Sequence, residues 1–214
     1  MSEQTVSGLA QQLPLNVLTD FGDLRRRLMT EQDALSLFQL LGGDKSFEFL
    51  LVSWENVPQH PTTEADFEQI VRELLRKHRE EEFIPYIIER LDCTVIGLDL
   101  YTVHPGCKAN EVEIMFIVGE RYRSSAQSRG CGYFQAATFS SMKILANHGF
   151  TSTRWIDRER NPQSWKANCA IGKVDRTVKY DGHRYEVLVV TPEEWPDAGT
   201  ILWDKYEQRI TQAA

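Results

Sequence analysis

A short apolar run, a glycine-containing turn and a helical pattern follow one another in the second half of this chain. Residues 113–118 are rich in branched and aromatic side chains, which predicts a buried strand. Residues 133–148 predict a helix, and Gly149 is well placed to end it. The segment between strand and helix contains the sequence Gln127-Ser128-Arg129-Gly130-Cys131-Gly132.

The glycines of this segment predict a site for phosphate oxygens. Glycine lets the backbone pass close to a ligand, and the start of a helix adds free N–H groups and the positive end of its dipole. The alternative is that both glycines serve only the turn. A Walker loop would need Gly-x-x-x-x-Gly-Lys-Ser/Thr, and a dinucleotide fingerprint would need a third glycine where the chain has Gln135. Neither motif is present.

The remaining patterns predict an α/β (α+β) chain. We expect a first strand at residues 24–28 and capped helix starts at Thr30 and at Thr62-Thr63. Further strands are expected at residues 83–90, 94–103, 112–118 and 151–157, a helix from Asn161-Pro162, and a hairpin of residues 174–180 and 184–190. One mixed sheet flanked by helices accounts for this order. We expect a tail at residues 1–12, a single domain at 13–195 and a C-terminal extension at 196–214.

Charge and composition exclude several classes of protein. The net charge of −7 argues against a nucleic-acid-binding surface and weakly suits a cationic substrate such as an amine. The apolar runs are too short to cross a membrane and the first residues lack the pattern of a signal peptide, so we expect a cytoplasmic protein. The four cysteines show no C-x-x-C or metal-like spacing, which predicts reduced thiols and no metal.

The Gln-x-x-Gly-x-Gly spacing resembles the pyrophosphate loop of the GCN5-related N-acetyltransferases. In its order of motifs the chain resembles the RimJ/RimL-type branch of that superfamily. The motifs are residues 24–28 with 30–34, Ile96-Gly97, Glu113-Ile114, Asn161-x-x-Ser164, Gly172, Asp181-Gly182 and Glu194-Trp195. The similarity covers residues 24–195. Two departures are a longer segment between Glu113 and Gln127, and Lys173 where the family carries an aromatic residue.

The resemblance implies a mixed, mostly antiparallel sheet whose central strands splay apart to hold acyl-CoA. Acetyl-CoA is then the expected acyl-donor substrate. The residues expected to bind it are Phe116, Ile117, Val118, Gln127, Ser128, Arg129, Gly130, Cys131, Gly132, Tyr133, Asn161 and Ser164.

The chemistry of acetyl transfer to an amine suggests roles for a few of these residues. The amine must lose a proton, and Glu113 is the candidate base. The alternative is that Glu113 faces away from the site, and Glu111 has the same strand parity. The resemblance implies that Asn161 contacts the pantetheine arm and that Ser164 lies near the departing sulfur as the candidate acid, although the two residues also suit a helix cap and first turn. Tyr133 is a second candidate acid or a packing residue. Backbone N–H groups near residues 116–118 would polarise the carbonyl.

We therefore expect transfer of an acetyl group to a primary amine, either a protein N-terminus or a small molecule, in a ternary complex. The acceptor site is expected between the loop at residues 44–61 and the hairpin near Asp181. Neither nucleic acid nor membrane is expected as a partner, and a homodimer is possible. One alternative is a binding or regulatory protein that keeps the fold. A second is an acyltransferase that uses another acyl carrier.

Overall fold

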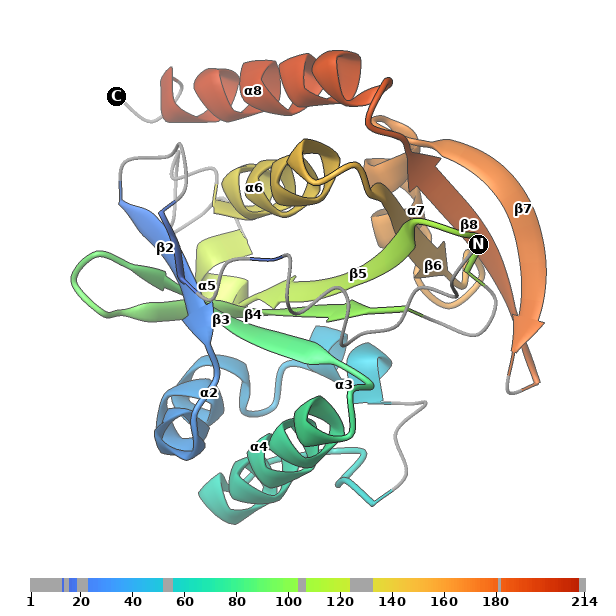
Figure 1. Cartoon of the computed structure of the whole chain (residues 1–214). Helices are drawn as coiled ribbons and strands as arrows, with labels where there is room; N and C mark the ends of the chain where they lie inside the picture. The colour runs from blue at the N-terminus through green and yellow to red at the C-terminus, as the bar shows by residue number, and fades with distance from the viewer. Residues whose placement is uncertain are drawn as a thin grey trace.

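A mixed sheet of eight strands forms the centre of the computed structural model (Figure 1). The structure describes residues 13, 16–18, 23–51, 56–103, 107–123, 133–180 and 182–211. The strands are β1 (Asn16–Leu18), β2 (Leu24–Leu28), β3 (Ile84–Arg90), β4 (Val95–Thr102), β5 (Glu111–Val118), β6 (Thr151–Ile156), β7 (Lys173–Tyr180) and β8 (His183–Val190). They lie in the order β1-β2-β3-β4-β5-β6-β8-β7, and only β5 and β6 pair in parallel. The expected mixed, mostly antiparallel sheet is confirmed.

Helices cover both faces of this sheet. They are η1 (Glu31–Asp33), α2 (Ala34–Leu41), α3 (Lys45–Leu51), α4 (Glu64–Arg79), α5 (Glu120–Arg123), α6 (Tyr133–Asn147), α7 (Pro162–Cys169) and α8 (Trp195–Thr211). In Figure 1, α2, α3 and α4 lie below the sheet, whereas α6 and α8 lie above it. Each face of the sheet therefore buries its own set of apolar side chains.

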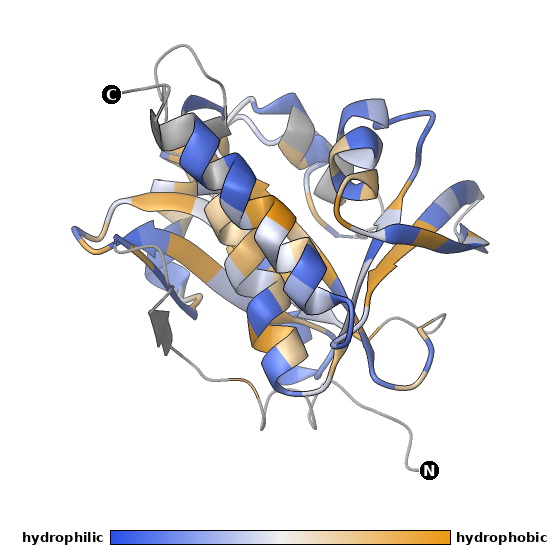
Figure 2. Cartoon of the chain, turned by 90° about the horizontal axis from the view of Figure 1, so that it is seen from above, coloured by the Kyte–Doolittle hydropathy of each residue, from blue (hydrophilic) through white to orange (hydrophobic). Residues whose placement is uncertain are grey.

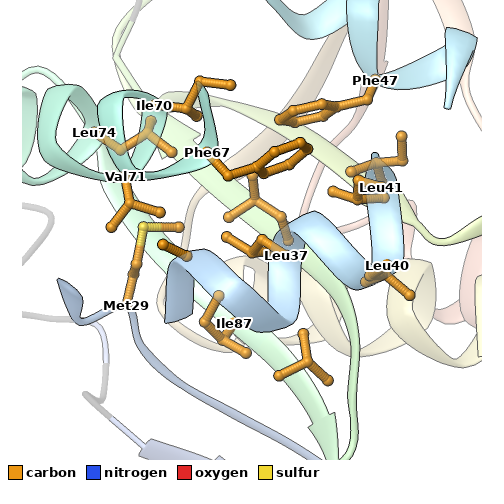
Figure 3. Packing of buried hydrophobic residues seen from close by; sticks show 14 of the residues in the cluster. Met29, Leu37, Leu40, Leu41, Phe47, Phe67, Ile70, Val71, Leu74 and Ile87 are labelled. Carbon is orange, nitrogen blue, oxygen red and sulfur yellow. The ribbon is translucent and has the colours of Figure 1, made fainter. Parts of the chain in front are cut away.

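The core below the sheet is built mainly by α2 and α4 (Figure 3). Helix α4 begins with a capping box in which Asp66 N donates to Thr63 Oγ1. Its buried residues Phe67, Ile70 and Leu74 recur at helical spacing, so one face of α4 points to the sheet. The rings of Phe67 and Phe47 stack with centroids 5.5 Å apart, which fixes α3 against α4.

The core above the sheet is formed by α6 and α8. Ala198 and Leu202 of α8 are buried in the same cluster as Met142 of α6. The ring of Trp195, at the start of α8, lies 4.9 Å from that of Phe139 on α6. Seen from above, α8 crosses the molecule with hydrophilic residues interspersed among apolar ones, as expected of a half-buried helix (Figure 2).

Most of the expected elements are present, and the structure also contains elements that the sequence did not predict. The predicted strands, the hairpin and the helices at residues 31–41, 64–79, 133–147 and 162–169 all form. Four elements were not expected: β1, α3 within the predicted loop at 44–61, α5 shortly after β5, and α8 within the predicted C-terminal extension. A reciprocal Thr191–Glu194 capping box precedes α8, and this signal was available in the sequence.

The basic run Arg25-Arg26-Arg27 stabilises the first strands of the sheet. Arg25 and Arg27 both pair with the buried Glu89, at 2.5 and 3.0 Å.

Within the described residues, no helix is long and apolar enough to cross a membrane. The same residues contain no group of His, Cys, Asp and Glu side chains that could hold a metal ion.

Candidate active site

The parallel strands β5 and β6 pair over only three residues before they part. The pairs are Glu111–Thr151, Val112–Ser152 and Glu113–Thr153. Beyond them β5 continues along β4, whereas β6 pairs with β8 up to Ile156. No described strand pairs with residues 114–118 on the side that faced β6. We call this segment the unpaired β5 edge, because its backbone N–H and C=O groups on that side pair with no described strand and need other hydrogen-bond partners.

Glu113 occupies the last rung before the strands part. Its side chain is buried, with 5% of the residue exposed. Burial raises the pKa of the carboxyl group to about 8, although the backbone N–H of Trp155 and the charge of Arg154 act in the opposite direction. A carboxyl group with a pKa near neutrality can accept and release a proton under physiological conditions.

Glu111, the other carboxylate of the same strand face, is held in a structural ion pair. Its two oxygens receive both terminal nitrogens of Arg176, at 2.9 and 2.6 Å. The backbone N–H of Lys108 also donates to it at 2.7 Å. The structure therefore separates the two carboxylates that the strand pattern left equivalent: Glu111 is fully paired, whereas Glu113 has the raised pKa.

The side chain of Arg154 lies on the opposite face of the sheet from Trp155, where α6 packs. Its guanidinium carbon lies 4.2 Å from the ring centroid of Phe116, and that ring lies 5.1 Å from Phe134 on α6. Arg154 is buried, and its Nε and Nη2 atoms have no hydrogen-bond partner among the described residues. Burial lowers its pKa to about 10, with the charge of Asp99 acting in the opposite direction. Arg154 is a residue of the site that the sequence motifs did not predict.

A buried polar cluster supports this region from β2, β4 and α6. Arg26 Nε lies 2.8 Å from Asp99 Oδ2, and both side chains are almost fully buried. The same carboxylate oxygen accepts hydrogen bonds from Tyr101 at 3.0 Å and from Ser141 at 2.8 Å. Asp99 therefore binds Arg26 and two hydroxyl groups through Oδ2, whereas its Oδ1 atom has no hydrogen-bond partner among the described residues.

Helix α7 carries the two other predicted polar residues. Asn161 caps it, since its Oδ1 atom accepts from the backbone N–H of Ser164 at 3.1 Å. Asn161 N donates to the carbonyl of Asp157 at 2.8 Å, which anchors α7 directly after β6. Ser164 Oγ accepts from Asn168 Nδ2 at 3.3 Å, and in the described part of the chain no acceptor is present for its own proton. The helix cap formed by Asn161 is compatible with the predicted role of Ser164 as a proton donor.

The predicted donor-binding residues are only partly within the described structure. Phe116, Ile117 and Val118 lie on the unpaired β5 edge. Tyr133 is the first residue of α6, and its hydroxyl group donates to Asp23 Oδ2 at 3.0 Å, as expected of a packing and anchoring residue. The predicted phosphate loop, residues 127–132, lies outside the described residues.

Aromatic side chains extend the face of the sheet on which Glu113 lies. The ring of Trp155 is 6.4 Å from that of Tyr180 and 6.3 Å from that of Tyr185. Trp155 is two residues beyond Thr153, the partner of Glu113, so alternation places it on the same face. The hairpin of β7 and β8 thus brings an aromatic surface to the same face of the sheet as Glu113.

No protein-family model and no curated protein matches the sequence. Solved structures do match the fold. RimJ from Mycobacterium smegmatis, in complex with CoA-disulfide, is 16% identical with a TM-score of 0.59, covering 91% of this chain and 93% of that one. The fold is that of the RimJ/RimL-type acetyltransferases.

Two further structures agree with this fold. RimL, a ribosomal L7/L12 α-N-protein acetyltransferase in complex with coenzyme A, is 16% identical with a TM-score of 0.58, covering 84% of this chain and 97% of that one. An acetyl transferase from Salmonella typhimurium that modifies the N-terminal serine of L7/L12 is 13% identical with a TM-score of 0.57, covering 79% and 95%. At such identities the comparison establishes the fold, and function must be argued from the site.

Proposed function

We propose that this protein is an N-acyltransferase that moves an acyl group, in the simplest case acetyl, from acyl-CoA to a primary amine. The observation that carries this proposal is Glu113: a buried carboxyl group with a pKa of about 8, at the rung where β5 and β6 part. A structural carboxylate would be paired, as Glu111 is. A base for an ammonium group benefits from a pKa between those of ordinary carboxylates and amines.

The unpaired β5 edge supports the placement of the donor. Acyl-CoA supplies a thioester carbonyl, and its pantetheine arm carries amides that can pair with a strand edge. Backbone groups of residues 116–118 would hold that arm and polarise the carbonyl. The glycine loop at residues 127–132 remains the predicted site of the pyrophosphate.

Two proton transfers of the reaction have a proposed carrier in this chain. Glu113 takes a proton from the ammonium form of the acceptor, directly or through water, and the freed amine attacks the thioester carbonyl. The carbon–nitrogen bond forms, the carbon–sulfur bond breaks, and the thiolate takes a proton from the Ser164 hydroxyl. A second proton passes from the nitrogen to solvent as the amide forms, and Ser164 regains its proton from solvent.

The acceptor is proposed to be a peptide N-terminus or a small amine. Two structural neighbours act on the N-terminus of a ribosomal protein, which makes a peptide the first class to test. The aromatic surface of Trp155, Tyr180 and Tyr185 offers ring faces to a cationic amine. The net charge of −7 favours the approach of such a cation.

The first experiment measures thermal unfolding with and without saturating acetyl-CoA. At about one hundred times its dissociation constant, a ligand of the folded state adds roughly 2.7 kcal/mol of stability. Release of free thiol is then followed with amines that include peptides with N-terminal serine. Absence of any stabilisation would favour a binding protein or another acyl carrier, such as acyl carrier protein, over the proposed enzyme.

Three variants then separate chemistry from folding. Glu113→Gln and Ser164→Ala are expected to lower kcat by about 10²- to 10⁴-fold while acetyl-CoA still stabilises the protein. Glu111→Gln is the matched control on the same strand face, and it should lose stability through Arg176 but retain kcat. Equal activity of wild type and Glu113→Gln would remove Glu113 from the mechanism.

A further inference from the structure

The guanidinium of Arg154 is a buried cation whose hydrogen-bonding capacity is only partly used. Arg154 is 8% exposed, and its Nε and Nη2 atoms have no partner among the described residues. The guanidinium lies over the ring face of Phe116, which attracts the positive charge but accepts no conventional hydrogen bond. Buried guanidinium groups are normally paired with carboxylates or phosphates, since an unpaired buried charge is costly.

Neighbouring anions do not supply this partner. Asp99 carries one negative charge for two buried guanidinium groups: its Oδ2 atom is shared by Arg26, Tyr101 and Ser141, and its Oδ1 atom has no hydrogen-bond partner among the described residues. Glu113 is the other acid near Arg154, and its raised pKa leaves it mainly protonated at neutral pH. One positive charge in this cluster is therefore uncompensated, at the place where the two strands part.

We infer that Arg154 receives a carboxylate of the substrate, namely the terminal carboxylate of a dicarboxylic acyl group carried on coenzyme A, such as succinyl. This inference rests on the proposed function and names its donor more closely. The planar guanidinium offers Nε and Nη2 side by side, which matches the two oxygens of a carboxylate.

The position of Arg154 favours the donor over the acceptor as the source of that carboxylate. Arg154 is the first β6 residue beyond the last rung, and it contacts Phe116, which lies on the unpaired β5 edge. A pantetheine arm paired with residues 116–118 would direct its acyl group towards that rung. The acceptor base Glu113 and the aromatic surface lie on the opposite face of the sheet. Transfer would form an amide that retains the free carboxylate and would release the CoA thiol.

Binding of succinyl-CoA and of butyryl-CoA to the full chain tests this inference. Both acyl groups have four carbons, but only succinyl carries the charge. A hydrogen-bonded pair with a charged group predicts about 10- to 100-fold tighter binding of succinyl-CoA to the wild type in isothermal titration. Equal affinities in the wild type would overturn the inference without the need for a variant.

Variants assign the effect to this side chain. Arg154→Gln should bring the ratio of affinities close to one while acetyl-CoA binding persists, and Arg154→Lys should retain part of the preference. The exposed Arg72→Gln on α4 is the matched control and should keep the full ratio. A succinyl preference that survives in Arg154→Gln would overturn the assignment.

A final arm examines the acceptor as the source of the carboxylate. Turnover of acetyl-CoA is compared for serine and for serinamide. An Arg154-dependent preference for serine, with no preference among donors, would overturn the donor assignment and move the carboxylate to the acceptor. If neither acetyl-CoA nor succinyl-CoA binds, the proposed function falls as well. If acetyl-CoA binds and turns over without any carboxylate preference, only this inference falls.

Discussion

Replacement of Glu113 by Gln tests the raised pKa directly through stability. In the folded protein the carboxyl group keeps its proton up to a pKa of about 8, whereas its ordinary value is 4.5. The folded state therefore binds more protons than the unfolded state between these values. By linkage, wild-type stability falls as pH rises through this window, because ionisation favours the unfolded chain. Gln is uncharged, has nearly the same shape as Glu and retains an oxygen for the Trp155 N–H. The stability of the variant therefore lacks the pH dependence that Glu113 contributes.

The magnitude follows from the two pKa values. Between pH 5 and pH 8 the free energy of unfolding of wild type should fall by about 3 kcal/mol relative to Glu113→Gln. Most of the change lies below pH 7, since the folded group begins to ionise near pH 7 and the difference then levels off. Other groups that titrate in this range contribute equally to both proteins and cancel in the difference.

Urea unfolding at four pH values between 5 and 8 measures this difference. Asp33→Asn is the control: burial raises the pKa of Asp33, but hydrogen bonds from Arg27 and Thr30 outweigh this and lower it overall. Its carboxylate is ionised in both states above pH 5, so its difference from wild type should be constant. Parallel pH curves for wild type and Glu113→Gln would show that Glu113 is charged in the folded state, which refutes its assignment as a base poised near neutrality.

Three further predictions concern the frame around the site. Gly97→Ala should cost about 1–3 kcal/mol, because the added Cβ would lie 2.4 Å from a β5 carbonyl oxygen; an unchanged Tm would contradict this contact. Arg26→Met should cost about 3–5 kcal/mol by leaving Asp99 buried and unpaired, and Asp99→Leu in the same chain should restore most of the loss in urea unfolding. Leu202→Ala should cost about 2–5 kcal/mol, whereas the exposed Ile201→Ala should stay within about 0.5 kcal/mol; similar values for both would place α8 outside the core.

The sequence predicted elements wherever local chemistry was decisive. Short apolar runs marked β3 and β5, and capping residues marked the starts of α4 and α7. The helix α3 was missed because its seven residues lie between a glycine pair and a loop with two prolines. What stabilises α3 is a tertiary contact, the stacking of Phe47 on Phe67, and no local pattern reports such a contact.

The site itself depended on pairings between distant segments. Strand parity placed Glu111 and Glu113 on one face, but only the β7 partner Arg176 distinguishes them. The point where β5 leaves β6 is set by register, which local sequence does not encode. The sequence contained a weak signal for Arg154 as a site residue. Side chains alternate along a strand, so Arg154 is expected on the same face as the apolar Ile156 and on the opposite face from Trp155. An arginine expected on a buried strand face is a site candidate.

Glu113 and Arg154 flank the same parting of the strands from opposite faces, so their charges are coupled. The positive charge of Arg154 lowers the pKa of Glu113 against the larger effect of burial. A carboxylate bound to Arg154 would cancel that influence, and the pKa of Glu113 would rise further. With the acyl-CoA saturating, kcat/KM for the amine reports the pKa of Glu113 in the acyl-CoA complex. The pH at which this kcat/KM reaches half of its maximum should therefore lie higher with succinyl-CoA than with butyryl-CoA. In Arg154→Lys the two profiles should move closer together, because a lysine holds the carboxylate less firmly. Coincident profiles in the wild type would mean that no charge enters beside the base, and the donor would then be a neutral acyl group.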